Sequence, residues 1–113
     1  MALRLGLDIG SGSLKAVIIR ENDEIDTLAV IGIQGQPIRR AKEVLEKVLE
    51  LCEGERIICG ATGSGAAALA ALIGVERVHE PNALAVAIEK LYPDVRTVIE
   101  MGRESQKYIL FER

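Results

Sequence analysis

The chain has 113 residues, of which 49% are hydrophobic, 27% are charged and only 3% are aromatic, and its formal net charge at pH 7 is -3. This length accommodates one hydrophobic core rather than two, and the core must be built mainly from aliphatic side chains. A weakly acidic chain with no basic stripe and few aromatic rings argues against nucleic acid as a partner.

Three aliphatic runs open the chain and predict an antiparallel meander of strands at residues 3–9, 14–20 and 26–33. Pro37 suits the first position of a helix, and apolar residues recur from there at helical spacing until about Gly54. The remaining predicted elements are a strand at 56–61, a small-residue helix at 63–74, a brief strand at 76–80 and a helix from Pro81 to Tyr92. The resulting order, β-β-β-α-β-α-β-α, is that of an α/β, ribonuclease-H-like lobe.

The last segment, residues 96–113, repeats the pattern of the first hairpin. In both copies a glycine stands two positions after an acid and a lysine seven positions after it, so that Asp8 and Lys15 correspond to Glu100 and Lys107. We therefore predict a lobe at residues 1–94 and the first hairpin of a truncated second lobe at residues 95–113. Because a severed hairpin leaves unpaired strand edges, residues 96–112 are expected to pair with the sheet of this lobe or with another copy as a homodimer.

The first hairpin turns at Gly10–Ser13, where glycines allow backbone N–H groups to converge on an anion. Ser11 and Ser13 add hydroxyl donors, Asp8 suits Mg²⁺ together with retained water, and Lys15 can neutralise a phosphate. The alternative is an ordinary Gly-Ser hairpin with an exposed acid and an exposed lysine.

Three segments, "GLDIGSGSLKAVII", "GATGSG" and "PDVRTVIEMGRESQKYIL", resemble in this order the ATPase activators of 2-hydroxyacyl-CoA dehydratases and the related benzoyl-CoA reductase ATPases. These belong to the superfamily of actin, sugar kinases and heat-shock chaperone ATPases. The resemblance implies that ATP and Mg²⁺ bind between two lobes, and that hydrolysis drives electrons from an iron-sulfur cluster into a dehydratase or acyl-CoA reductase partner. The cluster is expected only in a full-length relative, because neither Cys52 nor Cys59 matches a cluster cysteine.

The resemblance also implies roles for individual residues. The residues that match the two phosphate motifs are Asp8, Gly10, Ser11, Gly12, Ser13 and Lys15 in the first, and Glu100 and Gly102 in the second. Asp8 is expected to hold the metal, Asp8 and Glu100 to serve catalysis, and the others to contact nucleotide, while Thr62 to Gly65 match a further family loop. The second motif departs from the family, since Glu100 replaces an aspartate and Arg103 a glycine. The sequence therefore predicts nucleotide binding and leaves hydrolysis open, and the isolated chain is expected to be inactive.

Two other functions fit parts of the sequence. A ribonuclease-H-like module with a decayed nucleotide site would serve protein contact alone. Residues Gly63 to Ala68 also fit a dinucleotide fingerprint, with Glu80 at a strand end as the ribose-binding acid. The preceding meander speaks against this fingerprint and favours glycines that allow close packing of a helix on a strand.

Other features indicate a cytoplasmic protein whose cysteines do not form a metal site. The longest apolar stretch, residues 65–75, is shorter than the ~20 residues that span a bilayer, and Asp8 comes too early for a signal peptide. Cys52 and Cys59 are predicted to be reduced thiols in the core. His79, the only histidine, is expected to lie exposed at a strand end.

Overall fold

The structure is a computed structural model that describes residues 2–52, 54–102 and 106–112. It consists of two compact units, residues 1–77 and residues 78–113. The elements of the first unit are β1 (Ala2–Ile9), β2 (Ser13–Ile19), β3 (Ile25–Gly32), α1 (Pro37–Leu51), β4 (Arg56–Thr62), α2 (Ala66–Ile73) and β5 (Glu76–Arg77). Those of the second unit are α3 (Glu80–Leu91), β6 (Thr97–Met101) and β7 (Gln106–Leu110). The predicted order of strands and helices is confirmed, and the division into lobes at residue 94 stays a prediction.

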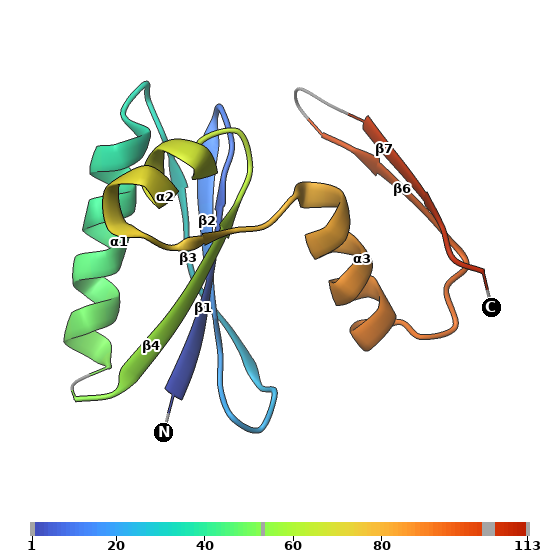
Figure 1. Cartoon of the computed structure of the whole chain (residues 1–113), viewed down its shortest axis with the longest axis horizontal. Coiled ribbons are helices and arrows are strands. Elements are labelled where there is room, and N and C mark those ends of the chain that lie inside the picture. Colours follow the sequence, from blue (N-terminus) through green and yellow to red (C-terminus); the bar gives the residue numbers. More distant parts are fainter. Residues whose placement is uncertain (1, 53, 103–105, 113) are drawn as a thin grey trace. The chain divides into compact units, whose positions relative to one another are not determined.

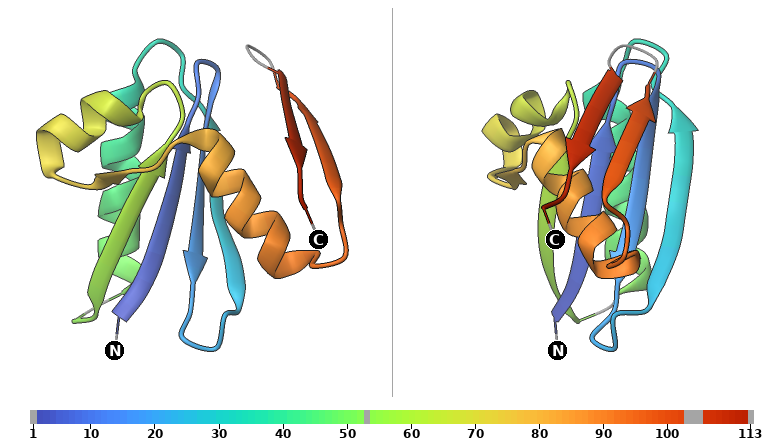
Figure 2. Two further views of the ribbon diagram at one scale, coloured as in Figure 1. Left: turned by 45° about the vertical axis from the view of Figure 1, so that its right-hand side comes forward. Right: turned by 90° about the vertical axis from the view of Figure 1, so that its right-hand side faces the viewer.

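The first unit contains a five-stranded sheet in the order β3-β2-β1-β4-β5 (Figure 1). β1 pairs antiparallel with β2, and β2 pairs antiparallel with β3, so the predicted meander is confirmed. β4 lies parallel to β1 on its other side, and β5 lies parallel to β4. Figure 2 shows the long strands side by side, with β1 in the middle of the sheet. The central strand therefore has a neighbour on each side at its carboxyl end.

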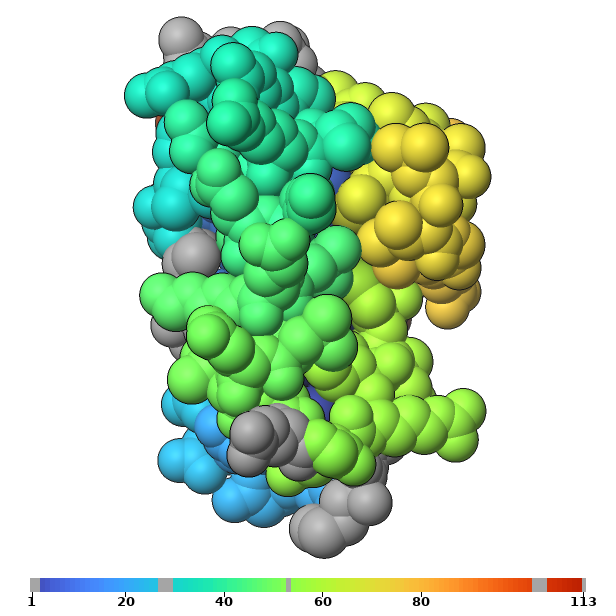
Figure 3. Space-filling model, turned by 90° about the vertical axis from the view of Figure 1, so that its left-hand side faces the viewer, coloured from blue at the N-terminus to red at the C-terminus, as the bar shows by residue number. Residues whose placement is uncertain are grey.

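One face of this sheet carries the core. Leu3, Leu5, Leu7 and Ile9 alternate along β1 with more exposed residues, and all four are buried. They pack in one cluster with apolar side chains of α1 and α2, among them Val44, Val48 and Leu69. Figure 3 shows that the side chains of α1 and α2 cover the sheet on this side. The other residues of β1, including Asp8, consequently point to the face that these two helices leave open.

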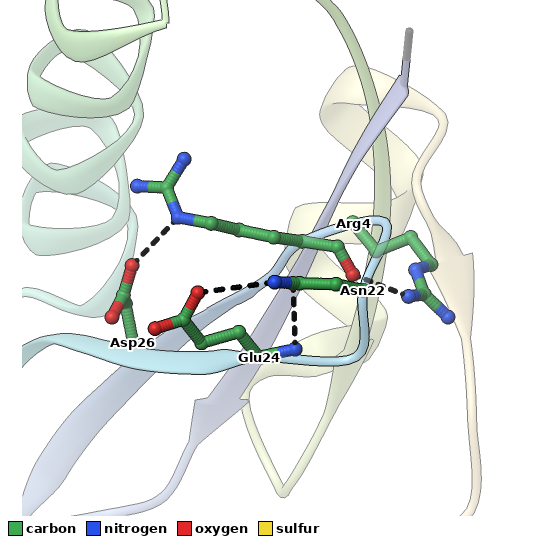
Figure 4. A network of polar contacts seen from close by, with 5 residues as sticks. Arg4, Asn22, Glu24 and Asp26 are labelled. Atoms are coloured by element: carbon green, nitrogen blue, oxygen red, sulfur yellow. Dashed lines mark hydrogen bonds and ion pairs between the residues drawn. The ribbon is translucent and has the colours of Figure 1, made fainter.

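The far end of the β2–β3 hairpin is fixed by a polar network (Figure 4). Arg4 donates from Nη2 to the carbonyl oxygen of Arg20 over 2.8 Å and pairs with Asp23 over 2.9 Å. Arg20 donates from Nε to Asp26 over 2.8 Å, which raises the pKa of Arg20. This network stabilises the turn at the opposite end of β1 from the Gly-Ser turn and takes no part in the candidate site.

In the second unit, α3 begins earlier than predicted. The predicted strand at 76–80 is confined to Glu76–Arg77, His79 caps the helix, and Glu80 is its first residue. Pro81 favours this arrangement, because proline is preorganised for the first turn of a helix. The placement of His79 and Glu80 at a strand end was therefore wrong.

The C-terminal strands form a sheet of their own. β6 and β7 pair antiparallel, with Glu100 opposite Lys107. In the described residues this pair does not join the five-stranded sheet, so the predicted pairing with that sheet is not observed, and pairing with another copy stays a prediction. No helix in the described part of the chain is long and apolar enough to cross a membrane.

Candidate functional site

Three polar residues meet at the carboxyl end of β1. In the ladders of the sheet, Asp8 lies opposite Lys15 on β2 and opposite Thr62 on β4. All three lie on the face away from α1 and α2, because Leu7 and Ile9 point to the core. Asp8 is half-buried and Lys15 is exposed. The structure thus brings together the predicted carboxylate and ammonium, with a hydroxyl group beside them.

The Gly-Ser turn between β1 and β2 is closed by its own backbone. The amide of Gly10 donates to the carbonyl oxygen of Ser13 over 3.0 Å, and the carbonyl of Gly12 accepts a hydrogen bond from the amide of Ile33 over 3.1 Å. The amide of Gly10 is therefore engaged within the turn and does not contribute to the predicted anion nest. Ser11, at the tip, is exposed and Ser13 is half-buried, so hydroxyl donors stand on both sides of Gly12.

The loop at residues 63–65, whose glycines were expected to allow close packing, supports this end of β1. Gly63 has a φ of +96°, and a Cβ there would lie 2.8 Å from Oδ1 of Asp8 and closer still to the carbonyl oxygen of Ile9. Gly65 donates from its amide to that same carbonyl over 2.9 Å, and a Cβ on it would overlap the side chain of Ile9. Both glycines are needed because the loop touches β1 directly. The glycine spacing that resembled a dinucleotide fingerprint therefore has a packing role.

Thr62 adds a feature that the sequence did not signal. Its Oγ1 is buried and has no hydrogen-bond partner among the described residues. A buried hydroxyl without a partner destabilises the protein by about 1–3 kcal/mol. Such a group beside a half-buried carboxylate is typical of a site that is adapted to something other than stability.

The polar groups at this site suit a phosphate group together with its magnesium ion. A carboxylate, two serine hydroxyls and a lysine ammonium surround a glycine turn, which matches the preference of Mg²⁺ for carboxylate, phosphate and water oxygens. Within residues 2–52, 54–102 and 106–112, no three His, Cys, Asp or Glu side chains gather to form a metal centre. An ion at this site would therefore depend on Asp8, with phosphate and water oxygens completing its shell.

The second hairpin holds its acid and lysine in direct contact. Nζ of Lys107 lies 3.0 Å from Oε1 of Glu100 and 3.1 Å from Oε2 of Glu80, and only 13% of the lysine side chain is exposed. The hydrogen bonds to Glu100 and then to Glu80 raise the pKa of Lys107. Gly102 follows β6 and is exposed, whereas Arg103, whose long side chain departs from the family motif, lies outside the described residues.

Both cysteines are free thiols, as predicted. Cys52 is buried at the end of α1, and Cys59 is half-buried on β4, where burial raises the pKa of its thiol. Both pack in the core of the first unit, so their surroundings are those of structural side chains.

The chain is similar to known dehydratase activators, although no family model matches it. It is 29% identical over 111 residues to the (R)-2-hydroxyglutaryl-CoA dehydratase activating ATPase of Acidaminococcus fermentans, and the alignment covers 96% of this chain and 42% of that protein. The crystal structure of component A of the dehydratase of this organism matches with a TM-score of 0.79 and 27% identity, over 99% of this chain and 44% of that one.

A second solved structure of a dehydratase activator also matches the chain. The activator of the 2-hydroxyisocaproyl-CoA dehydratase from Clostridium difficile, with bound ADPNP, matches with a TM-score of 0.77 and 24% identity, over 97% of this chain and 41% of that one. The predicted resemblance and the ribonuclease-H-like, actin-like ATPase fold are thereby confirmed. The chain spans less than half the length of these relatives.

Proposed function

We propose that this chain is the N-terminal nucleotide-binding lobe of an activator-type ATPase and that it binds Mg-ATP at the β1–β2 turn. The observation that carries the proposal is the grouping of Asp8, Lys15 and the Gly-Ser turn at the end of β1, with Gly63 packed against the carboxylate. Its likeness to an activating ATPase, and in fold to an activator with bound ADPNP, supports the same assignment.

Each residue of the turn has a defined task in this proposal. Asp8 holds the Mg²⁺ ion, Lys15 neutralises a phosphate oxygen, and the hydroxyl groups of Ser11 and Ser13 donate hydrogen bonds to phosphate. Gly63 leaves room for the carboxylate, since a Cβ at this position would lie 2.8 Å from Oδ1 of Asp8. When bound, Mg-ATP supplies the phosphoanhydride bond whose hydrolysis would drive the activator.

The wider function is proposed by analogy with the relatives. In a longer protein, the β6–β7 hairpin would begin a second lobe, and Glu100 and Gly102 would face the phosphates from that side. Hydrolysis would then be coupled to electron transfer from an iron-sulfur cluster, held elsewhere in such a protein, into a 2-hydroxyacyl-CoA dehydratase or an acyl-CoA reductase. The two free cysteines of this chain pack in its core.

The proposal is tested by nuclear magnetic resonance (NMR) titration of the ¹⁵N-labelled chain with Mg-ATP, and in parallel with NADH. We expect magnesium-dependent shifts at the amides of Gly10 to Lys15 that are lost in Asp8→Asn and kept in Asp94→Asn, which makes the same charge change at an exposed site. Shifts with NADH at Gly63 to Gly65 would instead favour dinucleotide binding. Because the chain supplies only part of the contacts of a two-lobe site, the affinity is expected to be weak.

A non-catalytic interaction module is the second candidate. The engagement of Glu100 with Lys107 favours it, because a paired carboxylate is not available to a metal until the pair separates. If the chain is folded and no nucleotide shifts the amide resonances of Gly10 to Lys15, the interaction module would be favoured over the ATPase lobe.

A further inference from the structure

The second hairpin contains a cluster of three charged side chains, Glu80, Glu100 and Lys107. Glu100 and Lys107 are cross-strand neighbours, as Asp8 and Lys15 are in the first hairpin. The third member differs: beside Asp8 stands Thr62, whereas Lys107 also contacts Glu80, the first residue of α3. Among the described residues, one ammonium is thus shared by two carboxylates.

The exposure of the three groups shows how a ligand would meet them. The side chains of Glu80 and Glu100 are 40% and 42% exposed, whereas that of Lys107 is 13% exposed. An approaching cation therefore meets the carboxylates first, and the ammonium lies beneath them. If Glu100 turned to that cation, Lys107 would lose the hydrogen bond to its cross-strand partner, which is unfavourable for a charged group.

Glu80 is suited to keep the ammonium neutralised in that state. It already lies 3.1 Å from Nζ of Lys107, and its own charge is favoured at the N-terminus of α3, where the helix dipole stabilises carboxylates. It is the acidic residue of the first turn, and the cap residue His79 makes no side-chain hydrogen bond there. Glu80 therefore lies beside Lys107 whether or not Glu100 leaves.

We propose that Glu80 is a positioning residue of the second hairpin: it gives Lys107 a second carboxylate partner, so that Glu100 can release Lys107 and bind the magnesium ion of a nucleotide. This inference rests on the proposed function, in which Glu100 faces Mg-ATP. Glu80 itself does not touch the metal, and its effect passes through Lys107.

The test is a double-mutant cycle on the whole chain, with Mg²⁺ alone as the probe and the amides of Glu100 and Gly102 as reporters. We expect Glu80→Gln to weaken magnesium binding about 10-fold, the equivalent of one charge-assisted hydrogen bond, and Glu80→Asp to restore part of it. Asp94→Asn, with the same charge change elsewhere in the second unit, should have little effect. In a Lys107→Met background, Glu80→Gln should have little effect either, because no ammonium remains to be held.

Several outcomes would overturn the inference. An equal loss with and without Lys107 would make Glu80 a direct metal ligand or a bulk charge. If Glu80→Gln leaves the magnesium affinity unchanged, Glu80 has at most a structural role, even if the variant has a lower free energy of unfolding. If Lys107→Met does not fold, the carboxyl carbons of the unaltered chain decide: on adding Mg²⁺, that of Glu100 should shift more than that of Glu80, and the reverse refutes the proposal.

The same titration separates this inference from the proposed function. Mg-ATP shifts at Gly10 to Lys15, with no response of Glu100 or Gly102 to Mg²⁺ or Mg-ATP, would refute the role of Glu80 and leave the first-lobe site standing. No response in either hairpin would refute both.

Discussion

Replacing Gly63 by alanine tests whether the loop after β4 holds Asp8 in place. The backbone at Gly63 has a φ of +96°, and a Cβ would meet Oδ1 of Asp8 at 2.8 Å and the carbonyl oxygen of Ile9 more closely. The left-handed backbone costs an alanine about 1–2 kcal/mol, and relief of an overpacked contact costs about 1–3 kcal/mol more. We therefore expect the first unit to lose about 2–5 kcal/mol of unfolding free energy, which lowers its Tm by roughly 10 °C or more.

The measurement needs a probe of the first unit alone. Tyr92 and Tyr108, the only tyrosines, both lie in the second unit, so urea unfolding should be followed by the amide resonances of β1 and β4. Gly54→Ala is the matched control, because Gly54 has a φ of +71° and nothing within 4 Å of its missing Cβ. It should show the backbone cost alone, about 1–2 kcal/mol. Equal losses in the two variants would refute the contact between the loop and Asp8.

Three further predictions address the other parts of the chain. Thr62→Val should leave the free energy of unfolding unchanged or raise it by up to about 1 kcal/mol, because a buried hydroxyl without a partner is removed. A lower free energy of unfolding in urea would indicate that Oγ1 has a partner. Glu100 and Glu80 raise the pKa of Lys107 above its ordinary value of 10.5, so its stabilising effect is complete below that pH and disappears as the pH rises through the folded-state pKa. Thermal melts between pH 9 and 12 should therefore converge for the unaltered chain and Lys107→Met. Deletion of residues 95–113 should change stability or oligomeric state, since Ile99, Met101, Tyr108 and Leu110 are exposed there; unchanged melting and sedimentation would contradict the predicted homodimer.

Local sequence patterns were sufficient to predict the elements. Alternating apolar residues predicted β1 and β2 because one face of each strand is buried against helices. Pro37 marked the start of α1, and the helix begins at that residue. At Glu80 the prediction was wrong by one residue, because the helix was expected to begin at Pro81, whereas the proline occupies the second position of the first turn.

The contacts that define the candidate site were harder to predict, because they join distant parts of the chain. Gly63 touches Asp8 only because β4 crosses over to lie parallel to β1. A glycine pattern records that a close approach is needed, but it does not name the partner of that approach. The same reasoning applies to Glu80, which meets Lys107 only after α3 folds back on the hairpin.

The two hairpins show why a shared motif does not fix the state of its charges. Both place an acid opposite a lysine in register, at the same spacing. Lys15 is nevertheless exposed, whereas Lys107 is 13% exposed and bridges two carboxylates. The difference arises from a third residue outside the motif, a threonine in one case and a glutamate in the other. If the proposed function is correct, the first hairpin presents its exposed lysine directly to phosphate, whereas in the second Glu100 must first separate from Lys107 before it can reach a metal.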